Sequence, residues 1–357
     1  MRVALACDWF LKYTCAQAAA MARAGADVVL LCRDHSLEFG GDADERHATI
    51  GIARDAGVLV LEAPGRLWDP KAVPVLLRIR RRIARFAPEV IHLHDGSVDP
   101  RALALLPRVT TVMTVHDPTV HPGHPEPRLL ARRWVLESSK RALKARAKAV
   151  VIHSDHLRPE VELRPGQRCV VVPHGLDLRD EPLSPPRLPV VGFFGRLQPY
   201  KGIEVLARAM PRVWETRPDV ELRVSGSGPV DVPLADPRVR LNRAYLPESG
   251  VEAFFRNTSL AVLPYTQASQ TGAGSVAVGF GVPVVASRLG GLPDLALDDT
   301  YLFDAGDDAG LAKAILSHID DDDAVRSRVL TEVAAPKSWD ATAVALLELY
   351  AQLLREP

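Results

Sequence analysis

Short apolar runs rich in valine, isoleucine and leucine alternate along the chain with longer segments whose apolar residues recur at helical spacing. Near-continuous apolar runs separated by helices are typical of parallel strands buried on both faces of a sheet. In the first half of the chain, strands are expected at 3–7, 27–32, 58–61, 90–93, 109–115, 149–153 and 169–172, and helices at 16–24, 75–86 and 129–147. This half therefore predicts one doubly wound α/β domain.

Residues 178–189 interrupt the alternation, since they hold four prolines and several charged side chains. Proline disfavours helix interiors and central strands, so this segment is expected to link two domains, with the boundary after residue 182. Beyond it, strands are expected at 190–194, 220–224, 239–241, 260–263 and 284–286, and helices at 204–216, 250–256, 274–280, 311–319, 324–333 and 339–354. Two such domains in tandem form a cleft between the carboxyl ends of their sheets, where open α/β sheets bind ligands.

The composition fits this picture and excludes some classes of protein. The chain has 357 residues, of which 47% are hydrophobic and 25% charged, and its formal net charge is 0. This balance is typical of a two-domain globular protein and gives no indication of a nucleic-acid partner. No apolar run is long enough to span a bilayer, the apolar start is too short for a signal peptide, and the cysteines lack metal-binding or redox spacing. The sequence therefore favours a cytoplasmic protein with reduced thiols.

A pair of basic residues follows the strand expected at 190–194. Arg196 offers a fork of donors suited to phosphate oxygens, and Lys201 adds a compact positive charge where a helix is expected to begin. Backbone amides and the helix dipole already favour an anion at such a place. By themselves, however, an arginine and a lysine at a strand–helix turn are ordinary surface residues.

Three further segments follow in sequence order. Residues 225–229 read Ser-Gly-Ser-Gly-Pro and permit close backbone approach, and residues 281–294 give a strand with a glycine-rich exit. Residues 266–274 precede a helix, so their amides and hydroxyls are suited to cradle a phosphate. Each segment is weak evidence alone, because glycine turns are common between strands and helices. The ordered set is much more specific.

This ordered set resembles the nucleotide-binding domain of the retaining GT-B glycosyltransferases of family 4, the group 1 transferases. The matching motifs are Gly-Arg-Leu (195–197) with Lys-Gly (201–202), Ser-Gly-Ser-Gly-Pro (225–229), Leu-Pro-Tyr (263–265), Gly-Val-Pro-Val-Val-Ala-Ser (281–287) and Gly-Gly-Leu-Pro-Asp (290–294). The N-terminal half fits more loosely, through residues 88–95, 114–117, 151–154 and 172–177. Trp339 and the final helix resemble the family's C-terminal element, which crosses back onto the first domain.

The resemblance implies a GT-B architecture, with two doubly wound Rossmann-like domains facing a central cleft. The acceptor-side domain would comprise residues 1–182 with the crossing helix 339–357, and the nucleotide-sugar-binding domain residues 183–338. The implied reaction transfers a hexose-type residue from a nucleotide diphosphate sugar to an acceptor, with retention at the anomeric carbon. The donor is a substrate, no cofactor or metal ion is expected, and the acceptor is left unnamed because variable loops bind it.

The resemblance also assigns residues to these roles. Arg196 and Lys201 would bind the diphosphate, and His116 would contact a distal hydroxyl of the sugar. The residues expected to contact the donor nucleotide sugar are Gly195, Arg243, Tyr245, Ser269, Gln270, Thr271, Gly272 and Ala273.

The sequence departs from the family pattern in both domains. Ala268 and Val276 stand where the family usually has glutamates that bind the donor sugar and the ribose, respectively. Some members carry a Ser-Gln-Ser-Gly type of loop instead, and residues 269–272 resemble it. These changes motivate the hypothesis that the donor is a deoxy- or amino-sugar. In the first domain, residues 12–14 read Lys-Tyr-Thr in place of the usual glycine pair, which weakens inferences about the acceptor.

Some of these residues have alternative interpretations. From its position, His116 is as readily an ordinary histidine at a strand end. A metal site formed with His121 and His124 is disfavoured, because the spacing matches no strong ligand pattern. The basic segments 78–85 and 128–148 are compatible with peripheral membrane contact, through 128–148 in particular, but a solvated helix face is favoured.

Other functions also stay open. A GT-B epimerase or hydrolase would act on the nucleotide sugar itself, although such an epimerase would be expected to show carboxylates in the cleft. A catalytically silent partner of another transferase would bind the donor without turning it over, and the missing glutamates motivate this alternative. A nicotinamide dehydrogenase is disfavoured, because the first strand leads into residues 8–11, Asp-Trp-Phe-Leu, rather than a glycine fingerprint.

Overall fold

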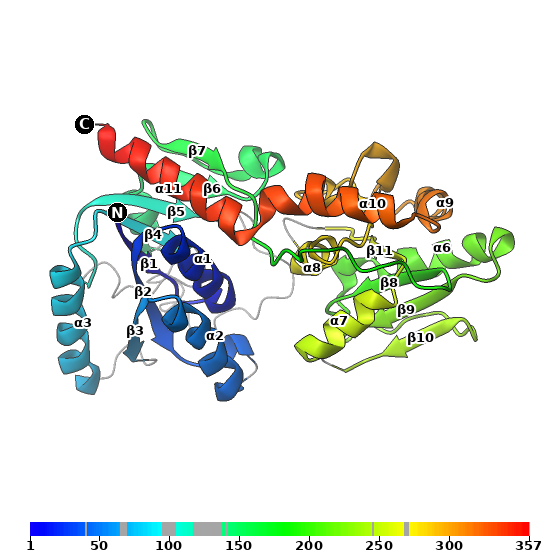
Figure 1. Ribbon diagram of the computed structural model, residues 1–357, viewed down its shortest axis with the longest axis horizontal. Coiled ribbons are helices and arrows are strands. Elements are labelled where there is room, and N and C mark those ends of the chain that lie inside the picture. Colours follow the sequence, from blue (N-terminus) through cyan, green and yellow to red (C-terminus); the bar gives the residue numbers. More distant parts are fainter. Residues whose placement is uncertain are drawn as a thin grey trace. The chain divides into compact units, whose positions relative to one another are not determined.

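The chain divides into two compact units, each built around a parallel β-sheet (Figure 1). The computed structural model describes residues 1–39, 41–64, 70–94, 105–116, 138–139, 141–244, 246–267 and 271–356. Unit 1 comprises Met1–Gly175 and Trp339–Pro357, and unit 2 comprises Leu176–Ser338.

The described sheet of unit 1 has seven parallel strands in the order β3-β2-β1-β4-β5-β6-β7. They are β1 (Arg2–Ala6), β2 (Asp27–Asp34), β3 (Leu59–Pro64), β4 (Val90–His94), β5 (Thr110–Thr114), β6 (Ala149–Ile152) and β7 (Arg168–Val171). These strands confirm the apolar runs predicted for this half, because strands buried on both faces are apolar throughout. The order reverses between β1 and β4, where Val3 pairs with Val90, and such a switch point is where doubly wound sheets bind ligands.

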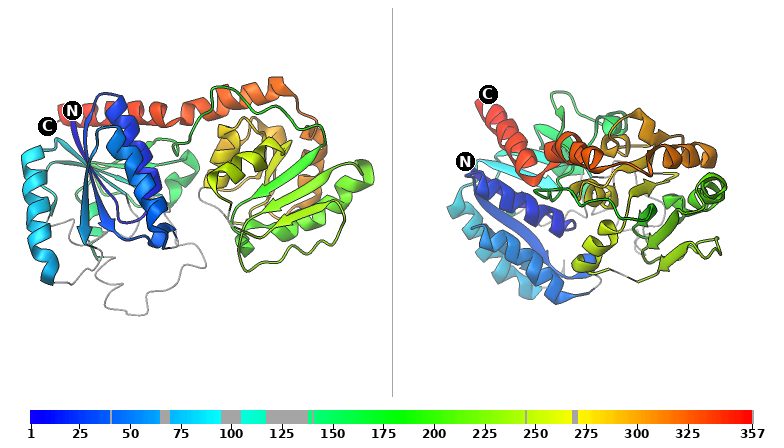
Figure 2. Two further views of the ribbon diagram at one scale, coloured as in Figure 1. Left: turned by 60° about the horizontal axis from the view of Figure 1, so that its bottom comes forward. Right: turned by 45° about the vertical axis from the view of Figure 1, so that its right-hand side comes forward.

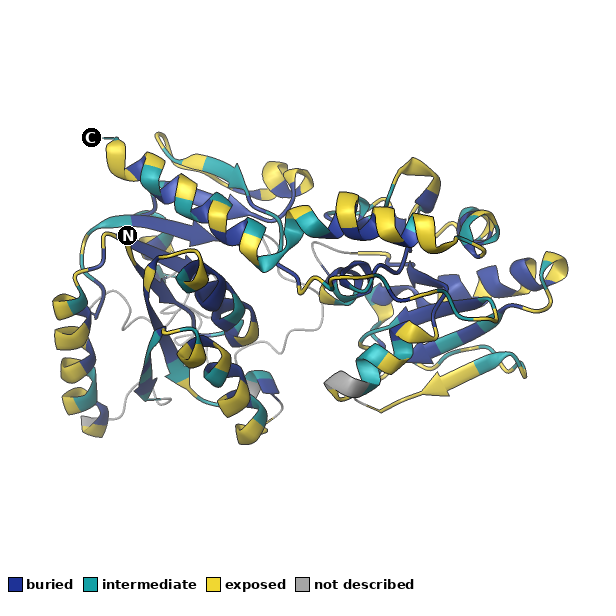
Figure 3. Ribbon diagram, viewed as in Figure 1, coloured by how far each residue is buried: buried dark blue, intermediate teal, exposed yellow. Residues whose placement is uncertain are grey.

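Helices cover both faces of this sheet (Figure 2). The helices among the described residues of unit 1 are α1 (Leu11–Arg23), α2 (Ala43–Asp55), α3 (Val73–Phe86) and α11 (Trp339–Arg355), with short turns η1 (Leu37–Phe39), η2 (Pro70–Ala72) and η3 (Asp155–Glu160). Leu5 of β1 shares one core with Ile50 of α2 and Leu346 of α11, so these helices cover one face. On the other face, Ile79 and Ile83 are the buried residues of α3, and most of that helix is exposed (Figure 3).

The sequence analysis did not predict α2. This helix carries few buried apolar residues, among them Ile50 and Ala53, so its apolar periodicity is weak. A capping signal was nevertheless present: the Asp42 carboxylate accepts hydrogen bonds from the amides of Asp44 at 2.9 Å and Glu45 at 3.0 Å. The predicted helix 129–147 lies mostly outside the described residues, and within it residues 141–144 are helical.

Unit 2 repeats the same architecture with six described parallel strands in the order β10-β9-β8-β11-β12-β13. The strands are β8 (Val190–Phe194), β9 (Glu221–Ser225), β10 (Val239–Asn242), β11 (Leu260–Leu263), β12 (Val284–Ser287) and β13 (Leu302–Phe303). The helices are α6 (Ile203–Thr216), α7 (Glu248–Arg256), α8 (Gly272–Gly279), α9 (Asp308–His318) and α10 (Asp323–Arg328). Short turns complete it: η4 (Pro199–Lys201), η5 (Pro293–Leu295), η6 (Asp299–Tyr301), the π-helical η7 (Val329–Ala334) and η8 (Ala335–Lys337). Its switch point lies between β8 and β11, which pair at Val191 and Leu260.

The proline-rich segment after Gly175 packs on unit 2, so the boundary between the units lies before it rather than after residue 182. The amide of Leu183 donates to the carbonyl of Phe280 at 3.1 Å. Arg326, which is fully buried, donates through Nη1 to the carbonyl of Leu183 at 2.8 Å and through Nη2 to that of Thr258 at 2.7 Å. The buried guanidinium thereby ties the segment to the core of unit 2.

The two ends of unit 2 lie side by side. Leu176 and Ser338 form a parallel β-bridge, and the amide of Leu176 donates to the carbonyl of Lys337 at 2.9 Å. The matching ends in unit 1 are also in contact, because a Cβ atom at Gly175 would lie 2.1 Å from Cε3 of Trp339. Only a glycine therefore fits against the Trp339 ring at this point.

Candidate functional site

Two loops at the carboxyl edge of the unit 2 sheet lie in direct backbone contact. The amide of Gly195, after β8, donates to the carbonyl of Ser225 at 3.0 Å, and the amide of Leu197 donates to that of Ser227 at 2.8 Å. A Cβ atom at Gly226 would lie 1.8 Å from the Gly195 oxygen. The glycine of this Ser-Gly-Ser-Gly-Pro segment therefore allows the neighbouring loop to approach closely and fixes the position of the Gly195–Leu197 turn.

The loop after β11 contacts the η4 turn after β8, and that turn contains the second basic residue, Lys201. Gly202 ends the η4 turn with a φ of 66°, and a Cβ atom there would lie 1.7 Å from the carbonyl oxygen of Pro264. The amide of Thr266 also donates to the carbonyl of Tyr200 at 2.9 Å. Tyr200 and Gly202 therefore hold Lys201, which lies between them, against the loop after β11. This contact crosses the switch point between β8 and β11.

Lys201 is a buried cation, with 9% of its surface exposed. Its Nζ atom lies 3.8 Å from the centroid of the Tyr265 ring, a cation–π geometry. Burial, and secondarily the positive charge of Arg196, lowers the pKa of Lys201 to about 7. Within the part of the chain that the structure describes, no acidic side chain forms an ion pair with Lys201 or with the exposed Arg196. A bound anion would therefore relieve an unfavourable buried charge.

Tyr265 links this lysine to the start of α8. Its hydroxyl lies 2.9 Å from Oγ1 of Thr271, the residue that precedes α8, and its carbonyl accepts from Oγ of Ser287 at 2.8 Å. Thr271 makes no side-chain cap to α8, so no side chain of that residue covers the amides of the first turn. A Cβ atom at Gly195 would lie 3.6 Å from Cβ of Ala273, which places that first turn beside the Gly195–Arg196 turn.

The structure thus brings together Gly195, Lys201, Thr271 and Ala273, four of the residues predicted to contact the donor, and Gly272 opens the same turn of α8. It adds Tyr265, which the sequence analysis named only as part of a matching motif. The signal was available, because Tyr265 ends the Leu-Pro-Tyr motif directly after β11.

The other predicted donor residues are placed differently. Arg243 pairs with Asp231 and donates through Nη2 to the carbonyl of Gly228 at 3.0 Å, so its guanidinium fastens the loop after β9. Tyr245, Ser269 and Gln270 lie outside the described residues.

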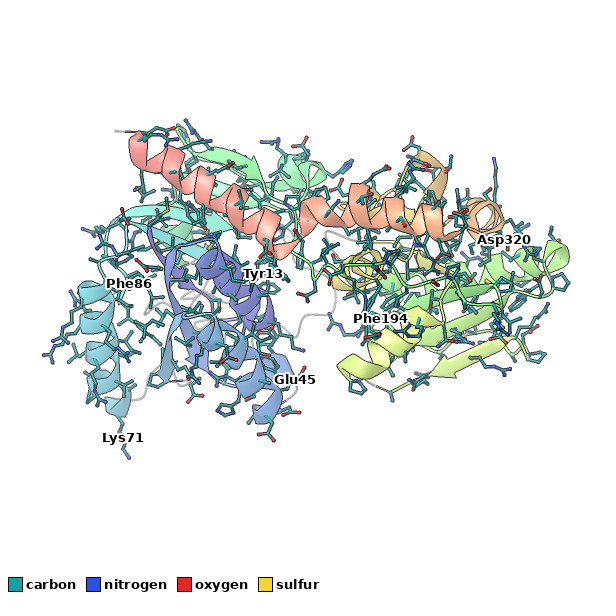
Figure 4. All side chains as sticks on the ribbon, in the orientation of Figure 1. Tyr13, Glu45, Lys71, Phe86, Phe194 and Asp320 are labelled. Carbon is teal, nitrogen blue, oxygen red and sulfur yellow. The ribbon has the colours of Figure 1, made fainter. Side chains whose placement is uncertain are left out.

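His116 belongs to unit 1, where it lies at the end of β5 within a group of imidazole rings. We call His92, His94, His116, His153 and His174 the histidine cluster; all five contact at least one other member or Tyr13 of α1, which is labelled in Figure 4. The His116 ring is 5% exposed, and the Phe10 ring lies over it at a centroid distance of 4.1 Å.

Both ring nitrogens of His116 have partners inside unit 1. Its Nδ1 lies 3.0 Å from Nε2 of His153, and its Nε2 lies 3.0 Å from Nδ1 of His94. Burial, and then the neighbouring histidines, lower the pKa of His116 well below its usual value, which keeps the ring neutral. The sugar contact expected of His116 therefore has no ring nitrogen left to make it in this arrangement.

The loop between β1 and α1 is closed by an acidic side chain. The Glu38 carboxylate accepts from the amide of Leu11 at 2.7 Å and from that of Lys12 at 3.4 Å, at the N-terminus of α1. Phe10 precedes the helix with a φ of 67°, a left-handed conformation that is costly for a residue with a side chain. The helix that contains Lys12, Tyr13 and Thr14 thus begins after a phenylalanine in a left-handed conformation, with its first amides bound to Glu38.

With this geometry established, comparison with known proteins decides the family. Residues 188–321 match the family described as Glycosyl transferases group 1, and residues 12–180 match Glycosyltransferase Family 4. The chain belongs to the group 1, family 4 glycosyltransferases. This confirms the resemblance inferred from the motifs of both halves.

One curated relative agrees with this assignment. A D-inositol 3-phosphate glycosyltransferase from Corynebacterium efficiens is 35% identical over 182 residues, which are 46% of this chain and 42% of that protein. The chain therefore spans less than half the length of this curated relative.

Solved structures of similar fold match nearly the whole chain. The sucrose-phosphate synthase of Thermosynechococcus elongatus matches with a TM-score of 0.69 and 20% identity over 99% of both chains. The Anabaena protein HepE, solved in complex with UDP and glucose, matches with a TM-score of 0.66 and 16% identity over 98% of this chain and 99% of that chain. These likenesses confirm the GT-B fold class, two parallel-sheet α/β domains.

The departures from the family pattern have structural counterparts. Val276 is half-buried in α8 and packs against the core of unit 2, so no carboxylate projects from this position. Ala268, the other replacement, lies outside the described residues, as do His121 and His124 of the metal-site alternative. Among the residues that are described, no group of three or more histidine, cysteine or acidic side chains is arranged to hold a metal ion.

The two basic segments differ in how much of them the structure describes. Residues 78–85 lie in α3, a helix exposed along most of its length, as expected of a solvated face. Of the segment 128–148, residues 128–137 and 140 lie outside the described residues. No helix in the described part of the chain is both long enough and apolar enough to cross a membrane.

Proposed function

We propose that this chain transfers a glycosyl residue from a nucleotide diphosphate sugar to an acceptor, with retention of anomeric configuration and without a metal ion. The observation that supports this most directly is the buried Lys201 ammonium beside Arg196, with no acidic ion-pair partner in the described structure. A cation kept in this state fits an anionic ligand, and it lies at the switch-point edge, next to the first turn of α8.

The two cations suit the chemistry of the leaving group. As the bond between sugar and phosphate breaks, negative charge grows on the diphosphate, and preorganised donors aimed at it lower the barrier. Removing one such donor typically costs about 3 kcal/mol of transition-state stabilisation, which is about a hundredfold in rate. With a diphosphate bound, Arg196 and the protonated Lys201 supply the charge neutralisation for which other phosphate-transferring sites use a metal ion. In the family mechanism the leaving phosphate accepts the acceptor's proton on the same face, which gives retention.

The surrounding residues support a donor orientation. We infer that Gly195, Thr271, Gly272 and Ala273 surround the diphosphate with backbone amides, with Ser269 and Gln270 near the sugar. We expect the nucleoside to bind beside residues 243–246, which follow β10 in the sequence. A protein of this fold, the Anabaena HepE, was solved with UDP and glucose, so the fold accommodates both parts of such a donor. The nature of the acceptor, including a membrane lipid reached through 128–148, is left open.

Calorimetric titration with UDP, UDP-glucose and GDP-mannose tests the proposal. We expect at least one of these ligands to bind, and Lys201→Ala to weaken it by tenfold or more. The matched control is Arg208→Ala, which removes an exposed cation from the same unit that pairs with Asp308 at 3.3 Å. Binding that survives Lys201→Ala would contradict the assigned site.

Product analysis separates the rival functions. Slow release of free sugar without an acceptor is expected of a competent transferase, and proton NMR of the product reports the anomeric configuration. An isomerised nucleotide sugar would identify an epimerase. Tight donor binding without any turnover, or no donor binding at all, would favour a catalytically silent partner.

A further inference from the structure

A cavity of about 670 Å³ lies at the amino edge of the unit 2 sheet, and this volume is within the range of small-molecule sites. Its lining includes Val190, the first residue of β8, and Arg256, the last residue of α7. Residues 179 and 181–188 form most of the rest. The proposed diphosphate site follows the other end of β8, about 13 Å away along that strand. The cavity is therefore separate from that site.

Arginines dominate the charged lining of this cavity. Among the described residues that line it, four are arginines and one is acidic, namely Arg179, Arg187, Arg223 and Arg256 with Glu181. Each guanidinium group offers five N–H donors in a fixed plane, a geometry that matches the oxygens of a phosphate. The lining therefore favours an anionic ligand.

Two of these arginines share one carboxylate. Glu252 of α7 lies 3.2 Å from Nη1 of Arg179 and 2.6 Å from Nη2 of Arg256. Both pairs are solvent-exposed, and exposed ion pairs contribute little to stability. An anion that enters the cavity can therefore bind these guanidinium groups without disrupting a strong interaction.

The other two arginines differ in their partners. Nη2 of Arg223 lies 3.3 Å from Glu221, whereas Arg187 is exposed and forms no ion pair with any residue that the structure describes. When Glu181, Glu221 and Glu252 are set against the four guanidinium groups, one positive charge remains in excess. Arg187 therefore offers a ligand a cation that no carboxylate already neutralises.

Contacts within unit 2 hold the lining in place without a ligand. The amide of Arg179 donates to the carbonyl of Gly279 at 3.2 Å, and its Cζ atom lies 5.2 Å from the centroid of the Phe280 ring. The amide of Val190 donates to Oγ of Ser259 at 3.0 Å. Because the lining is already ordered, a ligand loses less free energy to ordering it on binding.

Apolar surface lies beside the charged groups. Pro185, Pro186 and Leu188 also line the cavity, and Leu188 is 56% exposed. A phosphate ester combines an anionic group, which suits the arginines, with a carbon skeleton that covers such apolar surface. The volume of the cavity suits a small molecule rather than a macromolecule.

We propose that this cavity binds a small organic phosphate, whose phosphate group is held by the arginines and whose carbon skeleton contacts the prolines and Leu188. The proposal does not depend on the proposed glycosyl transfer, because the residues that line the cavity include neither Arg196 nor Lys201.

Titration of the full chain with three phosphates tests this proposal. The probes are fructose 1,6-bisphosphate, glucose 6-phosphate and inorganic phosphate, with glucose as the uncharged control, and nitrogen-15 NMR of the arginine Nε–H groups reports the contact. We expect the bisphosphate to bind most tightly, inorganic phosphate to bind most weakly and glucose not to bind. The resonances of Arg187 and Arg223, assigned by substitution, are expected to shift. If no phosphate shifts either resonance, the proposal is overturned.

Single substitutions then locate the site by affinity. Arg187→Gln and Arg223→Gln are each expected to weaken binding of the bisphosphate about tenfold, because a charge-assisted hydrogen bond is lost. Arg212→Gln is the matched control, since it removes an exposed arginine of α6 that pairs with Asp308 at 2.9 Å and does not line the cavity. Equal weakening by all three substitutions would show a general effect of surface charge and overturn the proposal. If Arg223→Gln fails to fold, Arg187→Gln decides the test, because Arg187 is exposed and has no ion pair in the described structure.

Competition with UDP separates this cavity from the proposed diphosphate site. Saturating UDP is expected to leave the bisphosphate bound, and Lys201→Ala is expected to leave its affinity unchanged. Displacement by UDP, or a loss of affinity in Lys201→Ala that is absent from Arg187→Gln, would assign the phosphate to the diphosphate site and overturn the proposal. If UDP itself fails to bind, the proposed function fails, while the bisphosphate titration still decides whether the cavity is a site.

Discussion

The Nζ atom of Lys201 lies 3.8 Å from the centroid of the Tyr265 ring, and this pairing replaces the acidic partner that a buried lysine normally has. A ring face stabilises a cation much less than a carboxylate does, so burial dominates and the pKa of Lys201 falls to about 7. The ammonium is therefore poised to change its protonation when an anion arrives. Because the Tyr265 hydroxyl also lies within hydrogen-bond distance of Thr271 at the start of α8, the same side chain connects both parts of the proposed diphosphate site.

Binding of UDP is expected to take up a proton at pH 7.5. The free protein holds Lys201 partly deprotonated at this pH, whereas a bound diphosphate favours the charged form and raises its pKa. The apparent binding enthalpy should therefore vary with the ionisation enthalpy of the buffer, and affinity should weaken as pH rises above 7. Lys201→Arg, whose charge does not titrate in this range, should bind without that proton uptake. A buffer-independent enthalpy in the wild type would contradict this prediction.

Replacing Lys201 with methionine is expected to stabilise the free protein while abolishing donor binding. The pKa of Lys201 in the folded protein, about 7, lies below the ordinary lysine value of 10.5, so between these values the unfolded chain binds more protons and stability rises with pH. Below pH 7 the buried charge costs on the order of 4 kcal/mol. The gain in the free energy of unfolding should therefore be larger at pH 6 than at pH 9.

Denaturant titrations at the two pH values measure this difference. Lys313→Met, which replaces an exposed lysine on α9 of the same unit, is the matched control and should show no such pH dependence. An equal effect of Lys201→Met at pH 6 and pH 9 would show that its ammonium is solvated.

Gly202→Ala is expected to destabilise the protein by more than the cost of a side chain at a positive φ. Any side chain at a φ of 66° costs about 1–2 kcal/mol, and here the Cβ atom would also lie 1.7 Å from the carbonyl oxygen of Pro264. Gly306 has a φ of 84° with no atom within 4 Å of an added Cβ, so Gly306→Ala carries the angular cost without the clash. Thermal unfolding should show the larger loss for Gly202→Ala, with donor binding lost as well. Equal effects of the two substitutions would argue against the close contact.

The donor is expected to have fewer hydroxyls than glucose, or an amino group in place of one. This follows from Ala268 and Val276, which replace two family glutamates, and Val276 packs against the core of unit 2 instead. Rates of sugar release across nucleotide-activated glucose, deoxy-sugars and amino-sugars measure the preference. A clear preference for UDP-glucose would contradict this prediction.

Much of the fold was predictable because its strands are buried on both faces. The run 260–263 is apolar throughout, and 90–93 is apolar except for His92; β11 and β4 lie there. The helix α2 was not predicted, because it has few buried apolar residues. Its capping residue Asp42 was a local signal that the sequence analysis did not use. β13 was missed because a strand of two residues, Leu302–Phe303, has no period to detect.

The candidate site was predictable only in part, because several of its contacts join segments that are far apart in the sequence. The motifs proposed to bind phosphate follow one another in the family's order along the sequence, so Gly195 and Lys201 are recognisable there. Tyr265 acquires its role from a contact across the sheet edge. The partners of His116 come from β4 and from the residues after β6, segments 22 and 37 residues away in the chain, which spacing cannot reveal. The left-handed conformation of Phe10 has no sequence signature either.

The contacts at Gly175 and Leu176 have a consequence for the engineering of this chain. Gly175 touches Trp339 within unit 1, and Leu176 bridges Ser338 within unit 2, so unit 2 enters and leaves unit 1 at a single seam. Residues 176–338 therefore form a continuous unit between the two segments of unit 1, and the two ends of this unit are in contact. A short peptide link from Gly175 to Trp339 would therefore join the two parts of unit 1 and leave out residues 176–338.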